Sequence, residues 1–529
     1  MSALPVNSPI QRLDFDILWC IVKINADMFE DYGALETTLA TSRVCHSWRS
    51  FMLSTTSIWA HLFDLDHGLW RTARGRRELI RRSGKALLWM KTNKYSPCTR
   101  DVLTVIGKQW GRIQKLEVTI RYGSGRLAQW SVLLRPAPHL ESFDIIYTWD
   151  CGKENHIFTS LFGGSAPMLR ELRFSGHRHT FSTAPSSWLR QLCSMDLSVE
   201  LTVSEMLKVL MSTNNLVNLR LDLTRVGHTT STCSLVSLPK LAHLNVNFAA
   251  ALTPHTLALL DHIYIPPTCS LTFAAQSIDL WEIDKKITST PIIRTLSAYA
   301  QSHFVDHTPQ KLWLTIVVGS FILKTASHPD GPTFEFSVDF SLEQMIPTHT
   351  LTTLLREFSL PGLSDVTWCG IRITGVKRPI PVFTTFMTCL PSVKTIATDK
   401  YSLRHLRAWS LRKDADTGPR IGFPVLKTLK LLSFHSPALA ADGVRDPVSK
   451  FVKARIMRGH AIGVIDFTEE TLDVLPNMAL LRKAVGLKVR WRQRGVGEIR
   501  EYICSTAPPQ KVNKWVTPNS QITGSGRAS

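Results

Sequence analysis

The sequence lacks the cysteine pattern of a zinc site or of a disulfide scaffold. Its ten cysteines are spread over 529 residues, and no two of them form a Cys-x-x-Cys pair. Zinc sites and small disulfide-stabilised domains place their cysteines in close pairs or at high density. We therefore expect reduced thiols that pack as small apolar side chains.

Long apolar runs are missing as well. The longest, residues 312–323, spans 12 residues and contains Thr, Gly and Ser, whereas a helix that crosses a bilayer needs about 20 apolar residues. Asp14 and Asp16 stand where a secretory leader would carry its apolar segment, and no small-residue cleavage site follows them. These absences predict a soluble protein of the cytoplasm or the nucleus, with no membrane partner.

The motifs that mark common catalytic sites are also absent. The chain has no Gly-x-x-x-x-Gly-Lys-Ser/Thr loop, no Gly-x-Gly-x-x-Gly, no His-Glu-x-x-His and no Gly-x-Ser-x-Gly. His177-Arg178-His179 could suggest a metal or acid–base cluster, but it has no Cys or carboxylate at zinc-ligand spacing, so an exposed loop is expected there. The sequence predicts no enzyme, no metal site and no cofactor.

Positive charge is what the chain has in excess. Its 62 Lys and Arg outnumber 42 Asp and Glu, which gives a net charge of +20. The cations gather at residues 71–100, where Glu78 is the single acid, and again from Arg482 onward. Such a surface attracts nucleic acid, anionic lipid or acidic proteins alike, or is simply a solvated surface without a ligand.

Apolar residues at helical spacing begin near the N-terminus. Leu13, Ile17, Ile21 and Ile24 recur at steps of four and three, which places them on one face of a helix. Two further stretches follow, one with Leu35 and Leu39 and one with Val44, Trp48 and Met52. Because small domains bury only about 60% of their chain surface, part of this apolar surface should remain as a docking patch. After these helices, the basic segment 67–100 predicts a helix ending near Ser83–Gly84 and a strand over 86–90.

A short pattern, apolar-x-x-apolar-x-apolar, recurs beyond residue 100. Its steps of 23 to 29 residues are those of leucine-rich repeats, in which the alternating part forms a strand. The pattern occurs at Ile113-Leu116-Val118, Leu140-Phe143-Ile145, Leu169-Leu172-Phe174, Leu192-Met195-Leu197, Leu216-Leu219-Leu221 and Leu241-Leu244-Val246. A helix is expected between Val203 and Met211. An ordinary α/β domain is the alternative interpretation.

The pattern is less regular further along the chain. Residues 271–273, 312–318 and 334–340 are expected as strands, and the stretch 275–345 is either an insertion or divergent repeats. The pattern resumes at Leu363-Val366-Trp368, Val393-Ile396 and Leu426-Leu429-Leu431. Residues 485–492 alternate apolar with basic residues, which predicts a terminal strand or cap, and the polar residues after Cys504 predict a flexible tail.

The first helices resemble an F-box. Residues 13–18 read Leu-Asp-Phe-Asp-Ile-Leu where that family opens with Leu-Pro-x-Glu-Ile-Leu, and residues 44–49 match its Val-Cys-x-x-Trp-Arg segment. Residues 55–59, Thr-Thr-Ser-Ile-Trp, are similar to its closing Thr-Pro-Ser-Leu-Trp, so both family prolines are replaced. Arg-Ser-Gly at 82–84 and the remainder resemble the divergent repeat region of large fungal F-box families.

The resemblance implies a partner and a task. F-boxes bind the Skp-type adaptor of a cullin-based ubiquitin ligase through apolar helical surface, and the repeat region would bind a protein substrate of unknown identity. The chain would supply no catalytic group, because its task is to raise the effective concentration of the substrate near the ubiquitin donor. By this resemblance, the residues in the module core or in contact with the adaptor are Leu13, Ile17, Leu18, Ile21, Val44, Cys45, Trp48 and Arg49. Of these, Leu13 and Leu18 are expected at the contact surface and Trp48 in the core.

The expected architecture is α/β: a short helical F-box followed by an irregular leucine-rich-repeat-like solenoid of parallel strands with helices. Its expected parts are residues 11–66 (F-box-like module), 67–100 (basic linker), 101–481 (solenoid) and 482–529 (basic cap and tail). One alternative is a nucleic-acid-binding protein that uses the basic runs 71–100 and 482–514, with Trp89, Tyr95, Trp491 and Trp515 stacking on bases. Another is an F-box-derived interaction scaffold without a ligase role.

Overall fold

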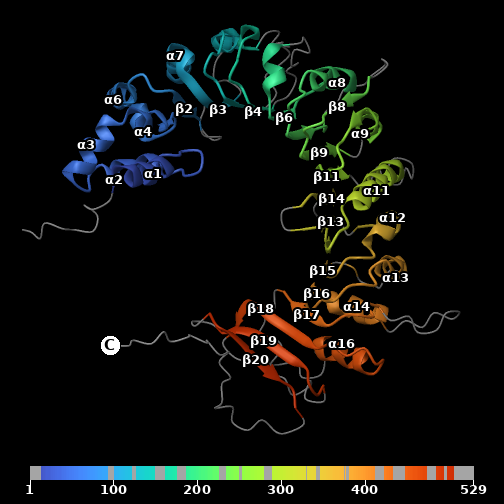
Figure 1. Ribbon diagram of the computed structural model, residues 1–529. Coiled ribbons are helices and arrows are strands. Elements are labelled where there is room, and N and C mark those ends of the chain that lie inside the picture. The colour runs from blue at the N-terminus through green and yellow to red at the C-terminus, as the bar shows by residue number, and fades with distance from the viewer. Residues whose placement is uncertain are drawn as a thin grey trace, which may run out of the picture. The chain divides into compact units, whose positions relative to one another are not determined.

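The computed structural model describes residues 14–92, 100–121, 127–148, 161–175, 186–224, 234–249, 253–278, 289–328, 331–340, 346–374, 376, 381–410, 422–432, 447–472, 484–493 and 497–505. The chain divides into two compact units, Met1–His307 with Gly319–Ile346 and Thr308–Val318 with Pro347–Ser529. Both units are mixed α/β, and each contains a mostly parallel sheet (Figure 1). The expected domain limits at residues 66, 100 and 481 stay predictions.

The N-terminal helices belong to the first unit. They are α1 (Phe15–Asn25), α2 (Ala34–Thr41), α3 (His46–Ser54), α4 (Thr56–Ala60), α5 (Gly68–Arg71) and α6 (Ala73–Ser83). α6 ends at Gly84, whose φ of 51° lies in the region that glycine adopts without strain. β1 (Phe63–Asp64) pairs in parallel with β2 (Leu88–Lys91), so the helical module is joined to the sheet by backbone hydrogen bonds. The expected helix end near residue 84 is confirmed, and the expected strand is found within two residues of its predicted position.

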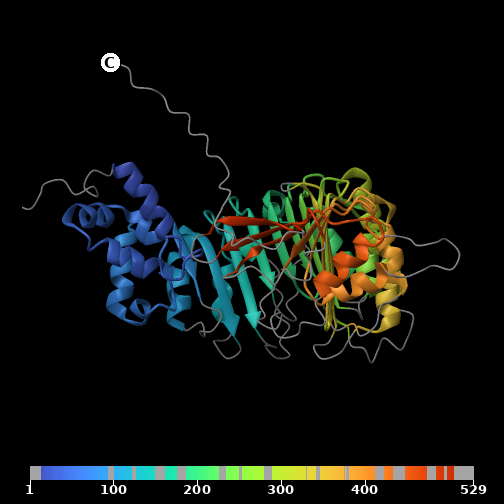
Figure 2. The ribbon, with the colours of Figure 1, turned by 90° about the horizontal axis from the view of Figure 1, so that it is seen from below.

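From β2 to β11 the strands of the main sheet in the first unit lie side by side in chain order (Figure 2). After β2 the parallel strands are β3 (Ile113–Arg121), β4 (Ser142–Thr148), β5 (Glu171–Ser175), β6 (Ser194–Ser198), β7 (Asn218–Asp222), β9 (His243–Ala249), β11 (Ser270–Ile278) and β14 (Thr333–Phe340). β13 (Ser320–Ala326) runs antiparallel to β14. A separate small pair joins β8 (Val236–Ser237) to β10 (Ile263–Tyr264).

Equivalent positions of the expected repeats are neighbours in the sheet. The first inward residues of successive strands pair in the order Leu116, Phe143, Leu172, Met195, Leu219, Leu244 and Leu271. All of these are buried, and so are the second inward residues, from Val118 to Val246. The leading residues Leu169, Leu216 and Leu241 are also buried, but they lie in turns just before their strands. The six strands expected from the pattern, and the burial of their inward residues, are confirmed.

Helices connect these strands on one side of the sheet (Figure 1). The α-helices are α7 (Arg100–Gln109), α8 (Val203–Met211), α9 (Thr253–Leu260) and α11 (Ser289–Asp306), and the 3-10 helices are η2 (Trp110–Arg112), η3 (Leu127–Leu134), η4 (Leu161–Gly164) and η5 (Ser187–Gln191). α8 has the expected bounds because Thr202 and Glu205 form a capping box at its start. Among the helices in the described ranges, none is long and apolar enough to cross a bilayer.

The second unit repeats the arrangement. Its parallel strands are β12 (Lys311–Val317), β15 (Trp368–Ile373), β16 (Thr395–Thr398), β17 (Thr428–Leu431), β18 (Val464–Leu472) and β19 (Lys488–Gln493). β20 (Ile499–Ile503) is antiparallel to β19. The helices are α12 (Thr348–Glu357), α13 (Pro381–Thr388), α14 (Ser402–Ser410) and α16 (Pro447–Ile456), with the 3-10 helix η7 (Pro361–Leu363).

The register of β15 differs from the expected one. Cys369 is the inward residue, paired with Leu312 on one side and Ile396 on the other, whereas Trp368 points to the outward side. The pattern predicts a large apolar residue at the inward position, but a buried cysteine fills it as a small apolar group. The strand expected over residues 485–492 is confirmed in β19, where Val489 and Trp491 are buried and the basic residues beside them are exposed. It is not the terminal strand, because β20 pairs with its other edge.

Candidate docking surface of the N-terminal module

α1 turns an apolar stripe to solvent. Ile17, Ile21 and Ile24 are 52%, 39% and 73% exposed, respectively. Their steps of four and three residues place them on one face of the helix. Leu18 and Val22 are buried on the other face, which packs on the rest of the module. The helix therefore presents an isoleucine stripe (Ile17, Ile21 and Ile24) that its own module leaves uncovered.

The second part of the F-box-like pattern lies at the start of α3. Val44 precedes the helix and is exposed. Cys45 is the N-cap residue, and its Sγ accepts a weak hydrogen bond from the backbone N–H of Trp48 at 3.5 Å. Trp48 is half-buried and Arg49 is exposed. The expectation that Val44 lies within the third helix is wrong, because Cys45 has an extended backbone and α3 begins only at His46.

The structure also corrects the contact role expected of Leu18. This side chain is 2% exposed and belongs to the core of the module, so it has no surface to offer a partner while the module is folded. Leu13 lies outside the described residues. Ile17, Ile21 and Val44, for which a place in the module core was the other possibility, are exposed instead.

Further exposed apolar residues of this module were not among the expected contacts. Phe15, Tyr32 and Leu53 are exposed, and the Phe15 ring packs against Phe51 with 5.7 Å between centroids. Of the 21 large apolar residues that are exposed in the described ranges, seven lie between residues 15 and 53. The sequence does indicate such exposed residues, because this segment has more large apolar residues than one face of each short helix can bury.

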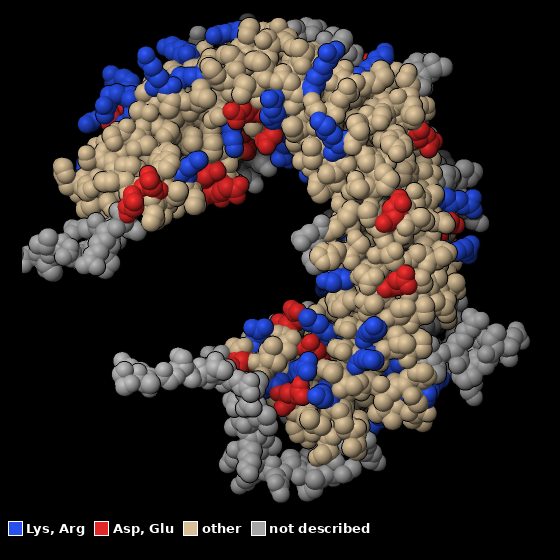
Figure 3. All heavy atoms as spheres, in the orientation of Figure 1, with Lys and Arg blue, Asp and Glu red and all other residues tan. Residues whose placement is uncertain are grey.

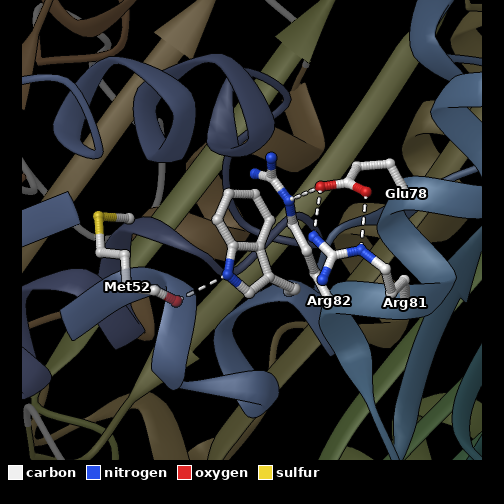
Figure 4. Close-up of polar contacts among 5 residues, drawn as sticks. Met52, Glu78, Arg81 and Arg82 are labelled. Carbon is white, nitrogen blue, oxygen red and sulfur yellow. Dashed lines mark hydrogen bonds and ion pairs between the residues drawn. The ribbon is translucent and has the colours of Figure 1, made fainter. Parts of the chain in front are cut away.

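Trp59 joins the end of the module to α6 through contacts with Met52 and Arg82, both labelled in Figure 4. Its indole is fully buried, and Nε1 donates a hydrogen bond to the carbonyl oxygen of Met52 at 2.7 Å. The guanidinium of Arg82 lies 4.4 Å from the centroid of the ring, a cation–π contact. Glu78 accepts hydrogen bonds from Arg81 at 2.7 Å and from Arg82 at 2.8 Å, and these hold the pKa of Glu78 down to about 2. Glu78 thus orients the arginine that covers Trp59.

A second set of contacts joins the loop after α1 to the first strands. The buried Lys91 ammonium, on β2, donates to the carbonyl oxygen of Met28 and lies 4.6 Å from the centroid of the Tyr32 ring. His61, just after α4, stacks on Trp89 of β2 at 3.8 Å. Burial lowers the pKa of His61 to about 4, so the imidazole is neutral at pH 7. The first helices are therefore attached to α6 through Trp59 and to the sheet through β2.

These contacts bear on the aromatic residues expected to stack on bases. Trp89 already carries His61 on its ring and has the Lys115 ammonium 4.2 Å from its centroid. Trp491 is buried in β19. The expectation of base stacking is therefore corrected for Trp89 and Trp491, and Tyr95 and Trp515 lie outside the described residues.

The basic segment forms an exposed face of α6. Arg74, Arg77 and Arg81 are exposed at steps of three and four residues, and Figure 3 shows Lys and Arg side chains along this edge of the first unit. Arg81 is paired with Glu78. The apolar stripe of α1 and this basic face thus lie on different helices of the same unit.

The described residues contain no recognisable metal centre, and no family model or curated protein matches the chain. Within the described ranges, no three His, Cys, Asp or Glu side chains lie close enough together to hold a metal ion. His177 and His179 lie outside those ranges.

Proposed function

We propose that this chain is a substrate-recognition adaptor of a Skp–cullin–F-box ubiquitin ligase, a non-catalytic subunit whose N-terminal module docks on the Skp-type adaptor. The observation that carries the proposal is the isoleucine stripe of α1. Apolar surface left in water costs about 25 cal/mol per Å², so a partner that covers the stripe gains that free energy. Exposed apolar patches on otherwise packed modules mark interaction sites.

The sequence pattern supports the same partner. Residues 44–49 match the Val-Cys-x-x-Trp-Arg segment of the F-box, and Val44 and Arg49 at its two ends are exposed. Arginine is one of the residue types that most often contribute strongly to protein interfaces. A surface that combines the stripe, Val44 and Arg49 would have the apolar centre and polar rim of a specific interface.

We propose further that the strands of both units form an irregular leucine-rich-repeat-like solenoid that binds a protein substrate. The support is the constant register of inward residues from β3 to β11, since stacked repeats bury one continuous core between neighbouring units. The contacts around Trp59 and Lys91 would hold the docked module against the first strands. A rigid connection suits a protein that acts by positioning, because it keeps the bound substrate close to the ubiquitin donor.

Copurification with a Skp-type adaptor tests the proposal. The full chain is expected to bind, and Ile17→Asp with Ile21→Asp should weaken binding by two orders of magnitude or more, because two carboxylates would be buried without partners. Met211→Asp with Val305→Asp is the matched control, since both residues are exposed on other helices of the first unit.

Two results would contradict the docking surface. One is retained binding by the stripe variant while its melting temperature equals that of the unchanged chain. The other is an equal loss of binding in the control. Copurification of a cullin together with the adaptor is expected of a ligase subunit, whereas adaptor without cullin would favour an interaction scaffold.

A further inference from the structure

Two tryptophans stand on the outward side of the sheet in the second unit. Along β12, Leu312 and Leu314 are buried and Trp313 points to the other side; along β15, Cys369 is buried and Trp368 points outward. The two ring centroids are 4.9 Å apart, and the ring planes meet at 53°. Both side chains are half-buried, so part of each indole meets solvent.

Gly370 is what allows this arrangement. It pairs with Trp313 across the two strands. A Cβ atom at position 370 would come within 2.9 Å of Cδ1 of Trp313 and within 2.9 Å of Cη2 of Trp368. Both rings therefore lean over the glycine instead of standing up from the sheet. Aromatic cover of a strand glycine also stabilises a sheet, so the tryptophans alone do not identify a ligand site.

Two cations beside the tryptophans are a second, independent observation that points to a ligand. Lys311 pairs with Trp368 across the strands, and Arg372 pairs with Thr315 on the same outward side. Both cations are exposed, and within the described residues neither forms an ion pair. Strand geometry places Lys311 about 5 Å from Trp368 across the sheet, and Arg372 about 13 Å from Trp368 along β15. Two indoles are thus framed by two uncompensated positive charges.

We propose that this tryptophan patch (Lys311, Trp313, Trp368 and Arg372) binds single-stranded nucleic acid. Bases stack on the indoles, and the two cations contact the phosphates on either side. Aromatic stacking combined with backbone-directed positive charge is how sequence-tolerant single-strand binding is achieved. A neutral sugar would leave both cations without a role, and an acidic protein segment would leave the indoles without one. The proposal concerns the second unit and does not depend on the adaptor function of the first.

Fluorescence anisotropy with labelled oligo(dT) and oligo(U) of about 15 nucleotides, added to the full chain over a series of salt concentrations, tests this. Trp313→Ala with Trp368→Ala should weaken binding about 30- to 25,000-fold, since each of the two stacked bases contributes about 1–3 kcal/mol. Lys311→Ala with Arg372→Ala should make the slope of log Kobs against log salt shallower by about 1.4, because each phosphate contact contributes about 0.7 on a single strand. Comparing the two oligonucleotides shows whether the patch prefers DNA or RNA.

The matched control removes the same charge elsewhere in the second unit. Arg404→Ala with Lys453→Ala changes exposed cations on α14 and α16 and should leave the salt slope unchanged. The proposal is overturned if the control lowers affinity and slope as much as the patch variants do. It is also overturned if a duplex of equal length or polyglutamate competes as well as the single strand. If the double tryptophan variant has a lowered melting temperature, Trp368→Phe and the Lys311→Ala with Arg372→Ala variant are measured instead. Both of these variants keep aromatic rings over Gly370.

Discussion

Regularly spaced apolar residues have opposite surroundings in two regions of the first unit. In the sheet, Leu172, Leu219 and Leu244 are at most 2% exposed, each beside its equivalent on the neighbouring strand. In α1, Ile17 and Ile21 recur just as regularly and face solvent. A periodic pattern therefore predicts which residues share a face, but not whether another layer covers that face.

The difference follows from how each region is built. An inner strand of the parallel sheets in the two units (the array) has a neighbour on either side and connecting helices behind it, so its inward residues are enclosed by equivalent residues. α1 packs on α2 through one face, and its second apolar face has no further layer among the described residues. The array buries its apolar surface within the chain, while the module leaves part of its apolar surface for a partner.

The largest effect is expected where the array itself would be left uncovered. Ending the chain before residue 482 removes β19 and β20, and it uncovers Ile465 and Phe467 of β18, which lie beside Val489 and Trp491. The melting temperature should fall by roughly 10 °C, since the loss of several kcal/mol lowers it by about 2–4 °C per kcal/mol in domains of this size. Ending the chain after residue 505 should leave it unchanged. Equal melting temperatures for both truncations would mean that β19 caps nothing.

A single substitution in each region makes the comparison sharper. Leu219→Ala should lower the free energy of unfolding by about 2–5 kcal/mol, because it opens a cavity in the array. Ile21→Ala should change it by less, about 1 kcal/mol or below, because 39% of this side chain is already exposed to solvent. Urea unfolding of the two variants measures both values. A large effect of Ile21→Ala would show that the stripe is covered within this chain.

The sequence predicts the array better than it predicts the module, for a physical reason. A strand has a period of two residues, so an inward leucine implies the next one, and the six repeats from Ile113 onward align without error. The pattern failed at β15 because Cys369 fills an inward position without resembling a leucine. Strand direction is not encoded in a local pattern either, so the antiparallel strands β13 and β20 could not be predicted.

In the module the error lay in choosing between two faces of one helix. Ile17, Ile21 and Ile24 form the more continuous stripe, yet Leu18 and Val22 are the buried residues. Hydrophobicity alone cannot rank two apolar faces, since burial depends on where α2 docks. The contacts of Trp59 with Arg82 join residues 23 positions apart, and no local pattern indicates them.

At the joint between the two regions we expect a smaller effect than that of Leu219→Ala in the core. His61 stacks on Trp89, and burial, the largest influence, lowers its pKa to about 4; Lys23 and Lys115 act in the same direction and Asp27 opposes them. The unfolded histidine titrates near 6.5. Between pH 6.5 and 4 the unfolded chain therefore binds a proton that the folded chain does not, so the free energy of unfolding must fall as the pH falls.

His61→Phe keeps an aromatic ring on Trp89 and removes the titrating group. The loss of unfolding free energy between pH 6.5 and pH 4 should then be smaller by about 1–3 kcal/mol than in the unchanged chain, a range that allows for partial exposure of the ring. Urea unfolding at both pH values measures the difference, with His349→Phe, an exposed histidine on α12, as the control. The same pH dependence in His61→Phe as in the unchanged chain would mean that the imidazole is open to protons. His61 would then not stay stacked on Trp89, and the module would not be fixed to the array at this point.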